Sequence, residues 1–550
     1  MGLGEKNKKT KPTKQTMKKL KTITKDYNEY LSLGMIAIFG VTIRTINITQ
    51  AFVDHWSWRQ TDVAMVARNF YLHGFNIFYP QIDWAGAADG YIGMEFPLVP
   101  YLAALLYSYF GEHEWVGRSI SILFYLASLP LFYLFIRRME GPRVGLYAVA
   151  IYTLAPLCIF ASRSFMSDMA SMSFAIMSLY PFSRWLEETN NRKHLLFAGF
   201  TLCLGILTKP SAAIVGLPML YLAYDKLGIL LFKCRELWLF AIAVLGVPAL
   251  WYVHASHVAE MYAPQENFGS GLVQIVSVQD YLEIFERTFF SIGGVTVLTT
   301  ILMVAGLFVA AKSHGRWFFH WWLLGLLIFV ILAGHGNHLH DWYQLIYVPV
   351  CAVFAARALD YVFRRCSVFD SGKILGGIVV ATVFLALGAM SWWSVRILHG
   401  EWDLPSKEAG VALLKYAPVN SLILVANNGN PSTIYYSNRK GWIFPAAWLW
   451  DADSMEKLER CRNAGAEFLI INKYFYRPEK YPQFARYIDD NYPYIKKTDD
   501  FVIIDLRAGE HRTQIGNHCR MGKAQGLLNM GEEDLIENRK SHGLGTAMPY

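Results

Sequence analysis

Three charged side chains stand at two breaks between apolar segments. In ILTKPSA, Lys209 directly precedes Pro210, where a helix must end, and a lysine at such a break is suited to an anionic headgroup or phosphate. In ASRSFMSDM, Arg163 and Asp168 lie at the entrance to another apolar run. A carboxylate there is costly unless it is paired or hydrated, so it is a functional candidate by default. The plainer interpretations are that Lys209 extends to the lipid surface and that Asp168 caps the following helix.

A second polar group lies in the stretch VDHWSWRQTDVAMVARNF, residues 53–70, which follows the first apolar segment. Its apolar residues recur at helical spacing, whereas Arg59, Asp62 and Arg68 can face another way. This pattern predicts an amphipathic helix lying at a membrane interface. The aromatic residues around it fit a belt at the headgroup level or a wall against which a sugar stacks. A surface helix with a solvated charged face is the alternative.

Two further motifs hold polar residues beside apolar ones. Glu95 comes just before the apolar piece 97–110, whose early prolines suit the start of a re-entrant helix, although helix capping also explains this carboxylate. The sequence GHGNHLHDWYQL, residues 334–345, contains three histidines, among them His340, followed by Tyr343. The histidine spacing fits no standard zinc motif, so hydrated loop histidines are the plainer interpretation.

The composition places these motifs in a membrane protein. Of 550 residues 54% are hydrophobic and the mean hydropathy is +0.25, which is too apolar for a soluble protein. The net charge of +8 lies mostly beside apolar segments and indicates topology rather than nucleic-acid binding. Runs of roughly 15 to 22 apolar residues are close to the length that crosses a bilayer. They predict a polytopic α-helical protein with about 11 transmembrane helices, at 30–48, 119–136, 144–161, 169–186, 195–208, 211–224, 236–253, 291–311, 317–334, 345–357 and 374–395.

The positions of lysine and arginine predict which loops face outward. If 97–110 does not cross the membrane and belongs to a first external loop, 49–118, the basic loops after residue 111 all become cytoplasmic, as the positive-inside rule requires. The N-terminus is then cytoplasmic as well. The outward segments are those that hold the unusual polar residues, namely Asp62, Glu95, Asp168, Lys209 and His340. We therefore expect a site on the extracytoplasmic side.

The composition also divides the chain into four parts. Residues 1–29 form a basic cytoplasmic segment, and 30–397 form the transmembrane domain. In 402–507 short β-branched runs alternate with amphipathic helical patterns, which predicts a small extracytoplasmic α/β domain. Residues 508–550 are polar and glycine-dotted, and we expect a disordered or loosely attached tail.

The motifs, in this order, resemble the GT-C superfamily of membrane glycosyltransferases, specifically the branch that contains protein O-mannosyltransferases and the lipid A aminoarabinose transferase. The similarity covers roughly residues 30 to 360. It includes a first external loop with an acidic helix and Val-Ala-Arg, the Phe-Pro-Leu sequence from Phe96, Arg118 at the start of the next span, and the spacing from Arg163 to Asp168. The order of these elements is more specific than any one of them.

The chain departs from the family pattern in the first loop. The family normally has an Asp-Glu pair several residues before the Ala-Arg sequence, and here Arg59 and Gln60 stand in that place. Asp62, one helical turn further on, and Asp54, just before, are the available substitutes. Asp168 matches the second acidic position of the family without displacement.

The resemblance implies transfer of a sugar from a polyprenyl-phosphate donor to a glycan, lipid or protein acceptor, at the outer face of the inner or plasma membrane and with inversion at the anomeric carbon. Asp62 is the expected base for the acceptor hydroxyl, with Asp168 as the second catalytic carboxylate. No cofactor is certain, and a divalent cation held by Glu95 and His340 is the candidate. The residues expected to contact donor phosphate or substrate are Arg59, Arg68, Glu95, Arg163, Lys209, His340 and Tyr343.

Other functions fit parts of the pattern. The main alternative is a transporter or flippase for a lipid-linked or anionic substrate, which would have charges near mid-membrane and repeated halves. No internal repeat is present, and the candidate charges gather on one side of the predicted membrane. A metallohydrolase built on the loop histidines and an inactive protein that only binds a lipid-linked sugar are further alternatives.

Overall fold

The structure of the protein is a computed structural model. It describes residues 14–189, 191–262, 264, 273–291, 293–311, 315–368, 372–427, 429–444, 453–474 and 482–508, with side chains from residue 27 onward. Residues 1–13 of the predicted basic segment and 509–550 of the predicted tail lie outside the described residues.

Most of the described chain is helical, and five strands lie near its C-terminal end. The helices up to residue 398 are α1 (Lys14–Arg44), α2 (Ser57–His73), α3 (Leu98–Phe110), α4 (Glu114–Glu140), α5 (Pro142–Leu154), α6 (Pro156–Arg163), α7 (Ser167–Glu187), α8 (Arg192–Thr208), the 3₁₀ helix η1 (Pro210–Val215), α9 (Gly216–Leu227), η2 (Gly228–Lys233), α10 (Arg235–Met261), α11 (Val278–Phe289), α12 (Val297–Leu307), α13 (Phe318–Leu332), α14 (Gly334–Leu339), η3 (Asp341–Tyr347), α15 (Val348–Cys366) and α16 (Gly372–Leu398). The remaining elements are α17 (Leu404–Leu413), β1 (Leu422–Ala426), α18 (Ser432–Ser437), β2 (Gly441–Phe444), α19 (Ser454–Asn463), β3 (Ala466–Asn472), α20 (Pro482–Asn491), β4 (Tyr494–Lys497) and β5 (Phe501–Asp505).

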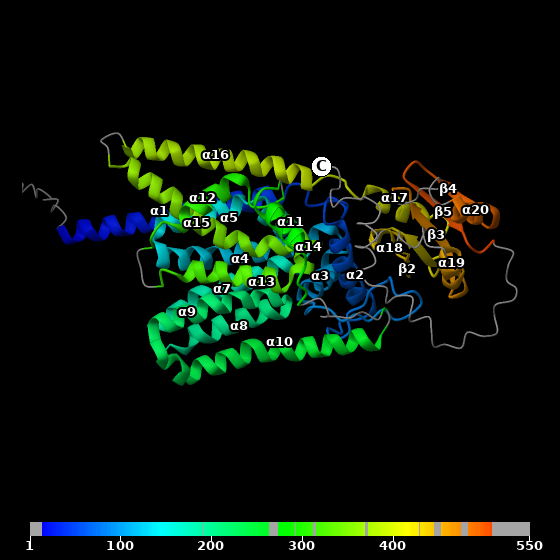
Figure 1. Cartoon of the computed structure of the whole chain (residues 1–550), viewed down its shortest axis with the longest axis horizontal. Helices are drawn as coiled ribbons and strands as arrows, with labels where there is room; N and C mark the ends of the chain where they lie inside the picture. Colours follow the sequence, from blue (N-terminus) through cyan, green and yellow to red (C-terminus); the bar gives the residue numbers. More distant parts are fainter. Residues whose placement is uncertain are drawn as a thin grey trace, which may run out of the picture.

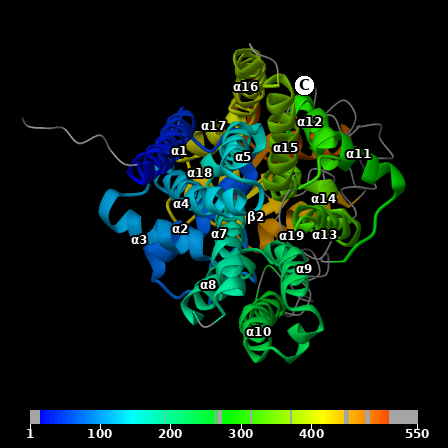
Figure 2. The ribbon, with the colours of Figure 1, turned by 90° about the vertical axis from the view of Figure 1, so that its left-hand side faces the viewer.

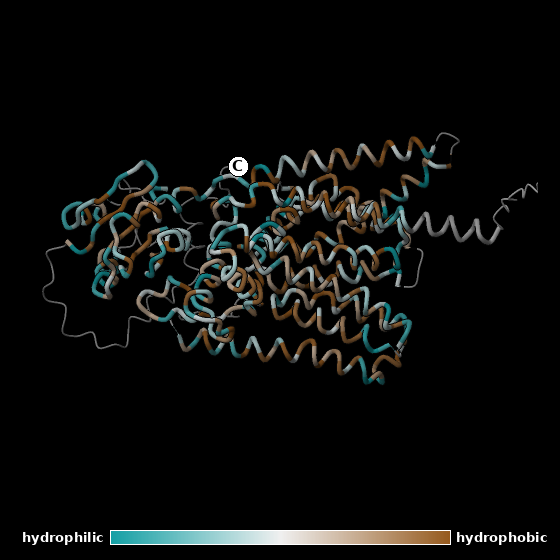
Figure 3. The backbone as a smooth tube through the Cα atoms, turned by 180° about the vertical axis from the view of Figure 1, so that it is seen from behind, coloured by the Kyte–Doolittle hydropathy of each residue, from teal (hydrophilic) through white to brown (hydrophobic). Residues whose placement is uncertain are grey.

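The long helices form a bundle whose axes run along the longest dimension of the molecule, and the sheet lies beyond one end of this bundle (Figure 1). Helices α2 and α3 lie at the same end, between the bundle and the sheet (Figure 1). Seen along the helices, α4 and α7 are central, whereas α10 and α16 are peripheral (Figure 2). Hydrophobic residues dominate the bundle, and hydrophilic residues gather at its ends and in the sheet region (Figure 3). This distribution is the one expected when the bundle is surrounded by lipid.

The membrane spans agree with the sequence prediction in kind, while their number stays a prediction. Each of the 11 predicted segments overlaps a helix. Among the described residues, five helices are long and apolar enough to cross a membrane, or six if the bent pair α5 and α6 is one span. The other segments correspond to shorter helices, such as α12 and α13, or to helices with more polar residues. The piece 97–110 contains the short apolar helix α3, beside α2.

A proline explains the bend between α5 and α6, whose axes differ by 63°. Pro156 has no N–H to donate, and its ring disfavours helical backbone at Ala155, which has an extended conformation with φ −60° and ψ 124°. The chain therefore turns here, and α6 delivers Arg163 and the segment before α7 to the end of the bundle where α2 lies.

Ion pairs join the helices at the other end of the bundle. Arg138 at the end of α4 pairs with Glu187 at the end of α7, and Arg357 of α15 pairs with Glu140. Arg143 in the first turn of α5 pairs with Asp360 of α15 at 3.1 Å. The basic residues that the sequence assigned to the cytoplasmic side thus converge at one end of the helices.

The C-terminal strands form one mixed sheet in the order β2-β1-β3-β5-β4. Strand β1 is parallel to β2 and β3, and β5 is antiparallel to β3 and β4. This sheet with its helices lies within 402–507, where the sequence predicts an α/β domain; the domain boundaries themselves stay a prediction.

The sheet shares a core with the first loop. Side chains of β1 alternate, so that Ile423 and Val425 belong to the same hydrophobic cluster as Val63 and Phe70 of α2, whereas Leu424 belongs to a cluster on the opposite face. Helices α17 and α18 complete the shared cluster. The α2 helix is therefore buried between the bundle and the sheet.

Candidate functional site

Asp168 and Lys209 meet because α7 and α8 are antiparallel neighbours. Asp168 is the second residue of α7, and Lys209 directly follows α8, so both lie at the same end of the pair. The Lys209 backbone is extended, as expected before Pro210, and the Ser171 hydroxyl donates to its carbonyl at 3.3 Å. The Lys209 ammonium is ion-paired with the Asp168 carboxylate, and both side chains are largely buried. A desolvated cation is thus available to an anionic ligand that displaces this carboxylate.

Arg59 connects two carboxylates. Its Nη1 donates to Oδ2 of Asp62 at 2.9 Å, one turn along α2, and its Nη2 donates to Oε1 of Glu95 at 2.5 Å. The second oxygen of Asp62, Oδ1, accepts a hydrogen bond from Nε1 of Trp84 at 3.3 Å. Asp62 is therefore held at both oxygens, and each oxygen retains a lone pair that can accept a substrate hydroxyl.

The backbone around Glu95 is fixed by helices α8 and α10. The N–H of Phe96 donates to the carbonyl of Leu207 at 3.0 Å, and Nε1 of Trp251 donates to the carbonyl of Met94 at 3.0 Å. These bonds place Glu95 close to the end of α8, where Lys209 lies. The Lys209 charge accordingly acts on Glu95 as well as on Asp168.

Aromatic rings from two distant segments line the same region. The His340 ring is nearly parallel to Trp342, with centroids 4.5 Å apart, and to Trp58, with centroids 5.7 Å apart. The Lys209 ammonium lies 4.1 Å from the ring centroid of Tyr343, a cation–π contact. Burial, together with the positive charges of Lys209 and Arg59, lowers the pKa of His340 to about 3. His340 is therefore a neutral ring at physiological pH.

A pair of partly buried hydrogen bonds joins these two segments. Oδ2 of Asp341 lies 2.8 Å from Nε2 of His55, and Oδ1 of Asp341 accepts from Nε1 of Trp56 at 2.8 Å. The start of α2 is thereby tied to the start of η3. This connection fixes the position of Arg59 relative to Tyr343.

The ionisable residues of the site differ in the direction of their pKa shifts. Burial is the main cause that raises the pKa of Asp62, against the opposing effects of Arg59 and the Trp84 hydrogen bond, and the nearby Glu95 adds to the rise. Burial also acts to raise the pKa of Glu95, but the positive charges of Arg59 and Lys209 outweigh it and hold that pKa below its usual value. Two neighbouring carboxylates with pKa values shifted in opposite directions are typical of an acid–base site.

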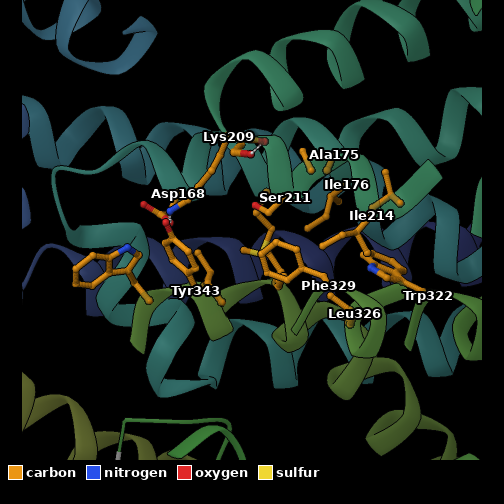
Figure 4. Close-up of a pocket in the computed structure, with 17 residues that line it drawn as sticks. Asp168, Ala175, Ile176, Lys209, Ser211, Ile214, Trp322, Leu326, Phe329 and Tyr343 are labelled. Atoms are coloured by element: carbon orange, nitrogen blue, oxygen red, sulfur yellow. Dashed lines mark hydrogen bonds and ion pairs between the residues drawn. The ribbon is translucent and has the colours of Figure 1, made fainter. Parts of the chain in front are cut away.

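A cavity opens beside the ion pair and continues between apolar helices. It contains about 510 Å³ of empty space, including its open mouth. Asp168, Lys209 and Tyr343 lie together at one end, Ser211 lies further along, and the other end is apolar (Figure 4). The apolar lining comes from α7, η1, α13 and η3 and includes Met172, Ala175, Ile176, Ile214, Val215, Trp322, Leu326, Phe329, Leu345 and Ile346. A charged end joined to an apolar groove fits an amphiphile with an anionic head.

Comparison with known proteins shows which solved structures share this architecture. The family model described as "Dolichyl-phosphate-mannose-protein mannosyltransferase" matches residues 95–253, and no curated protein sequence matches the chain. The structure of ArnT from Cupriavidus metallidurans bound to undecaprenyl phosphate is 12% identical with a TM-score of 0.59, covering 86% of this chain and 97% of that one. Archaeal oligosaccharyltransferase AglB from Archaeoglobus fulgidus, in complex with an inhibitory peptide and a dolichol-phosphate, is 12% identical with a TM-score of 0.57, covering 90% and 75%. Arabinofuranosyltransferase AftD from Mycobacteria is 14% identical with a TM-score of 0.55, covering 92% and 42%.

The chain has the GT-C fold. The resemblance inferred from its motifs is confirmed at the level of the fold, and the matched mannosyltransferase model and the ArnT structure both come from the branch expected there. The matched segment contains Glu95, Asp168 and Lys209, whereas Arg59 and Asp62 precede it. The helix that departs from the family pattern thus lies outside the match.

Two predicted site residues lie outside this cluster of the GT-C fold. Arg68 pairs with Glu112 at 2.6 Å, donates to the carbonyl of Tyr435 at 2.8 Å and stacks on the Tyr435 ring, so it attaches α2 to α18. Arg163 is fully buried and donates to Oδ2 of Asp54 at 2.9 Å. Both guanidinium groups are occupied by contacts within the protein and lie away from the cavity lining, and their predicted contact with the donor or substrate stays a prediction.

Asp54 is the second carboxylate that could replace the missing Asp-Glu pair, and its contacts argue against that role. It has no exposed side-chain surface and accepts hydrogen bonds from Arg163, from Arg118 at 3.2 Å and from Gln60 at 2.5 Å. Asp62 is also mostly buried, but 11% of its side-chain surface remains exposed, and it faces the cluster. The geometry therefore favours Asp62.

The metal prediction finds no geometric support at the predicted pair. Glu95 is bonded to Arg59, and the His340 ring is stacked on tryptophans. Among the described residues, three potential ligands come within 4.8 Å of one another elsewhere, at Asp280 and Glu283 of α11 and His338 of α14. The two carboxylates are distant from the histidine in sequence, so no spacing pattern connects the three residues.

Some residues of the site were missed from the sequence. Trp84 is one of the aromatic residues around the first-loop helix, and its hydrogen bond to Asp62 has no sequence signal. The apolar lining of the cavity, such as Ile176 and Ile214, reads as ordinary membrane-span sequence. Ser171 and Ser211 are small polar residues within such spans, a signal that was available.

Proposed function

We propose that the chain is a membrane glycosyltransferase that moves a sugar from a polyprenyl-phosphate donor to a glycan, lipid or protein acceptor. The observation that carries this proposal is the cavity, because its two ends match the two halves of such a donor. The Lys209 ammonium suits the phosphate, and the groove between α7 and α13 suits the isoprenoid chain. The ligands named for ArnT and AglB, undecaprenyl phosphate and dolichol-phosphate, belong to the same chemical class.

The departing phosphate gains negative charge as the anomeric C–O bond breaks. Lys209 can neutralise this charge once the phosphate replaces Asp168 as its partner, and Arg59 adds a second positive charge close to the site. Arg59 stays fixed by Asp62 and Glu95 during this exchange, so the change of partner is confined to Lys209. Asp168, released from Lys209, is positioned to accept a hydrogen bond from a sugar hydroxyl.

Asp62 acts as the base in this proposal. The acceptor hydroxyl gives its proton to an Asp62 oxygen while its own oxygen bonds to the anomeric carbon, and the lipid phosphate leaves from the opposite face with inversion. The raised pKa of Asp62 makes it a stronger base than an exposed aspartate. Glu95, with its pKa held low, stays ionised and holds Arg59 in place.

The proposed membrane arrangement follows from the charges at the two ends of the bundle. The arginine-rich end faces the cytoplasm by the positive-inside rule, and the end with Asp62, Lys209 and the sheet faces outward. The enzyme thus acts at the extracytoplasmic face of the inner or plasma membrane. A transporter requires its functional charges along a path through the bundle, whereas this cluster lies at one end.

A direct test measures binding of radiolabelled undecaprenyl phosphate to purified protein in lipid nanodiscs. Lys209→Met is expected to weaken binding about tenfold or more, since it removes a charge-assisted contact worth roughly 1.5–3 kcal/mol. The matched control is Lys226→Met on α9, an exposed lysine away from the cavity lining. Equal affinity in wild type and Lys209→Met would refute the assignment of the phosphate end.

A further inference from the structure

The segment between α2 and α3 forms a hairpin that carries two residues of the site. The N–H of Ile82 donates to the carbonyl of Gly90 at 2.9 Å, and the N–H of Ile92 donates to the carbonyl of Pro80 at 2.9 Å. Trp84 lies in the outgoing arm of this hairpin, and the returning arm leads to Glu95. Asn69 of α2 fixes the outgoing arm, because its amide donates to Oδ1 of Asp83 at 3.0 Å.

The edge of the C-terminal sheet completes the hydrogen bonding of this hairpin. Strand β2 is an edge strand, paired only with β1 among the strands of the sheet. On its open side the N–H of Gly441 donates to the carbonyl of Asp83 at 2.9 Å, and the N–H of Gly86 donates to the carbonyl of Gly441 at 2.6 Å. Ala85 and Trp442 form an antiparallel β-bridge at the same place. The residues on both sides of Trp84 are therefore held by the sheet.

A side-chain contact locks the same junction. The Trp442 ring lies directly on Gly86, so close that a Cβ on Gly86 would fall 2.2 Å from the indole. Gly86 also has φ +66°, a conformation that other residues adopt at a cost. Only a glycine fits both the backbone angle and the contact, so the sheet and the hairpin are shaped for one another.

The hairpin contacts the proposed base, Asp62, through Trp84. Trp84 directs its indole N–H at Oδ1 of Asp62, while Arg59 holds Oδ2. The orientation of the carboxylate plane therefore depends on one group from α2 itself and one group whose backbone is held by the sheet.

We propose that the C-terminal sheet positions the base: the β2 edge, through Gly441 and Trp442, holds Trp84 against Asp62. This inference rests on the proposed role of Asp62 as base. Trp84 and Trp442 are positioning residues, because they act through Asp62. The C-terminal sheet is then required for the reaction itself, independently of which acceptor the enzyme uses.

The test compares sugar transfer by Trp84→Phe, Trp442→Ala and the double variant in the full-length protein. Trp84→Phe removes the indole N–H and the pyrrole part of the ring while keeping an aromatic side chain, and it is expected to lower kcat roughly three- to tenfold with little change in the KM of the donor. Trp442→Ala is expected to lower kcat in the same way, and the double variant no further than the larger single effect, because both act through one contact. The control is Tyr494→Ala on β4, an aromatic residue at the opposite edge of the sheet, which is expected to leave kcat unchanged.

The pH profile separates this role from general destabilisation. The Trp84 hydrogen bond favours ionised Asp62, so losing it should move the acidic limb of kcat/KM to higher pH in both single variants, while Arg59 and Glu95, the charged groups that also face Asp62, are unchanged. Wild-type kcat and an unmoved acidic limb in Trp442→Ala would overturn the inference, as would additive losses in the double variant. Should Trp442→Ala not fold, Gly86→Ala, which pushes a methyl against the Trp442 ring, is judged by the same two outcomes. Absence of transfer by wild type from every donor would overturn both this inference and the proposed function, whereas turnover unaffected by Trp442→Ala would overturn only this inference.

Discussion

Asp62 is distinguished from the other acidic residues near it by its surroundings. Asp54 is enclosed by two arginines, and Asp168 is paired with Lys209. Asp62 shares Arg59 with Glu95, and burial raises its pKa. A carboxylate that is only partly neutralised and has a raised pKa is basic enough to act as a general base, and Asp62, unlike Asp54, keeps a small exposed surface for a substrate hydroxyl.

The raised pKa predicts the pH dependence of activity. Asp62 must be ionised to accept a proton, so activity should fall as the pH drops through a pKa above the usual aspartate value. In Glu95→Gln a negative charge that raises the pKa of Asp62 is lost, so the acidic limb of kcat/KM should move to lower pH. The measurement is kcat/KM across pH for wild type and Glu95→Gln. A shift of that limb to higher pH would contradict the assignment of Asp62.

At the scale of elements, a buried charge cluster joins three parts of the chain. Asp54, just before α2, accepts from Arg118 of α4 and Arg163 of α6, and none of the three side chains has exposed surface. Arg163 also donates to the carbonyl of Asn47 at 2.6 Å. This cluster fixes the place where the chain leaves α1 and enters the first loop.

Asp54→Asn is expected to destabilise the fold by about 3–5 kcal/mol, because it leaves two buried guanidinium groups without a counter-charge. Thermal unfolding in detergent measures this as a lower transition temperature. Asp62→Asn is the matched control, since Arg59 keeps Glu95 as a partner and the unfolding temperature should stay close to that of wild type. If Asp54→Asn unfolds at the wild-type temperature, the cluster has no structural role.

The elements were more predictable than their contacts. Hydrophobic runs gave the helices, because periodicity and length are local properties, and Pro156 and Pro210 break helices wherever they occur. The convergence of Asp62, Glu95, Asp168 and Lys209 was expected from charge distribution alone. The occupation of Arg68 and Arg163 by internal partners was not, since Glu112, Tyr435 and Asp54 are selected by three-dimensional packing. The contact between β2 and the first loop was not predicted either, because it joins residues that are far apart in sequence.

At the scale of the whole molecule, polarity is arranged along one axis. The arginine-rich ion pairs lie at one end of an apolar bundle, and the site with the sheet lies at the other (Figures 1 and 3). The cavity extends from the site into the apolar interior of the bundle. This arrangement suits a donor that reaches the site from within the bilayer while its sugar remains on the aqueous side.

The proposed orientation predicts the labelling of cysteines placed at the two ends. In a background without the seven native cysteines, Lys497→Cys on β4 should react with a membrane-impermeant maleimide on intact cells. Lys226→Cys on α9 should react only after the membrane is permeabilised. Both side chains are exposed, so access rather than burial decides the outcome. Labelling of Lys226→Cys alone on intact cells would invert the proposed topology.

The most direct test of the central claim is transfer of radiolabelled sugar from polyprenyl-phosphate monosaccharides by the purified protein in lipid, comparing wild type with Asp62→Asn and Asp168→Asn. Transfer, or slow donor hydrolysis, is expected from wild type. Loss of a general base typically lowers the rate about 10²- to 10⁴-fold, so Asp62→Asn should lose nearly all activity while remaining folded. The proposed site would be contradicted if Asp62→Asn and Asp168→Asn both transferred sugar at the wild-type rate. The glycosyltransferase assignment would be contradicted if the wild type were inactive with every donor and acceptor.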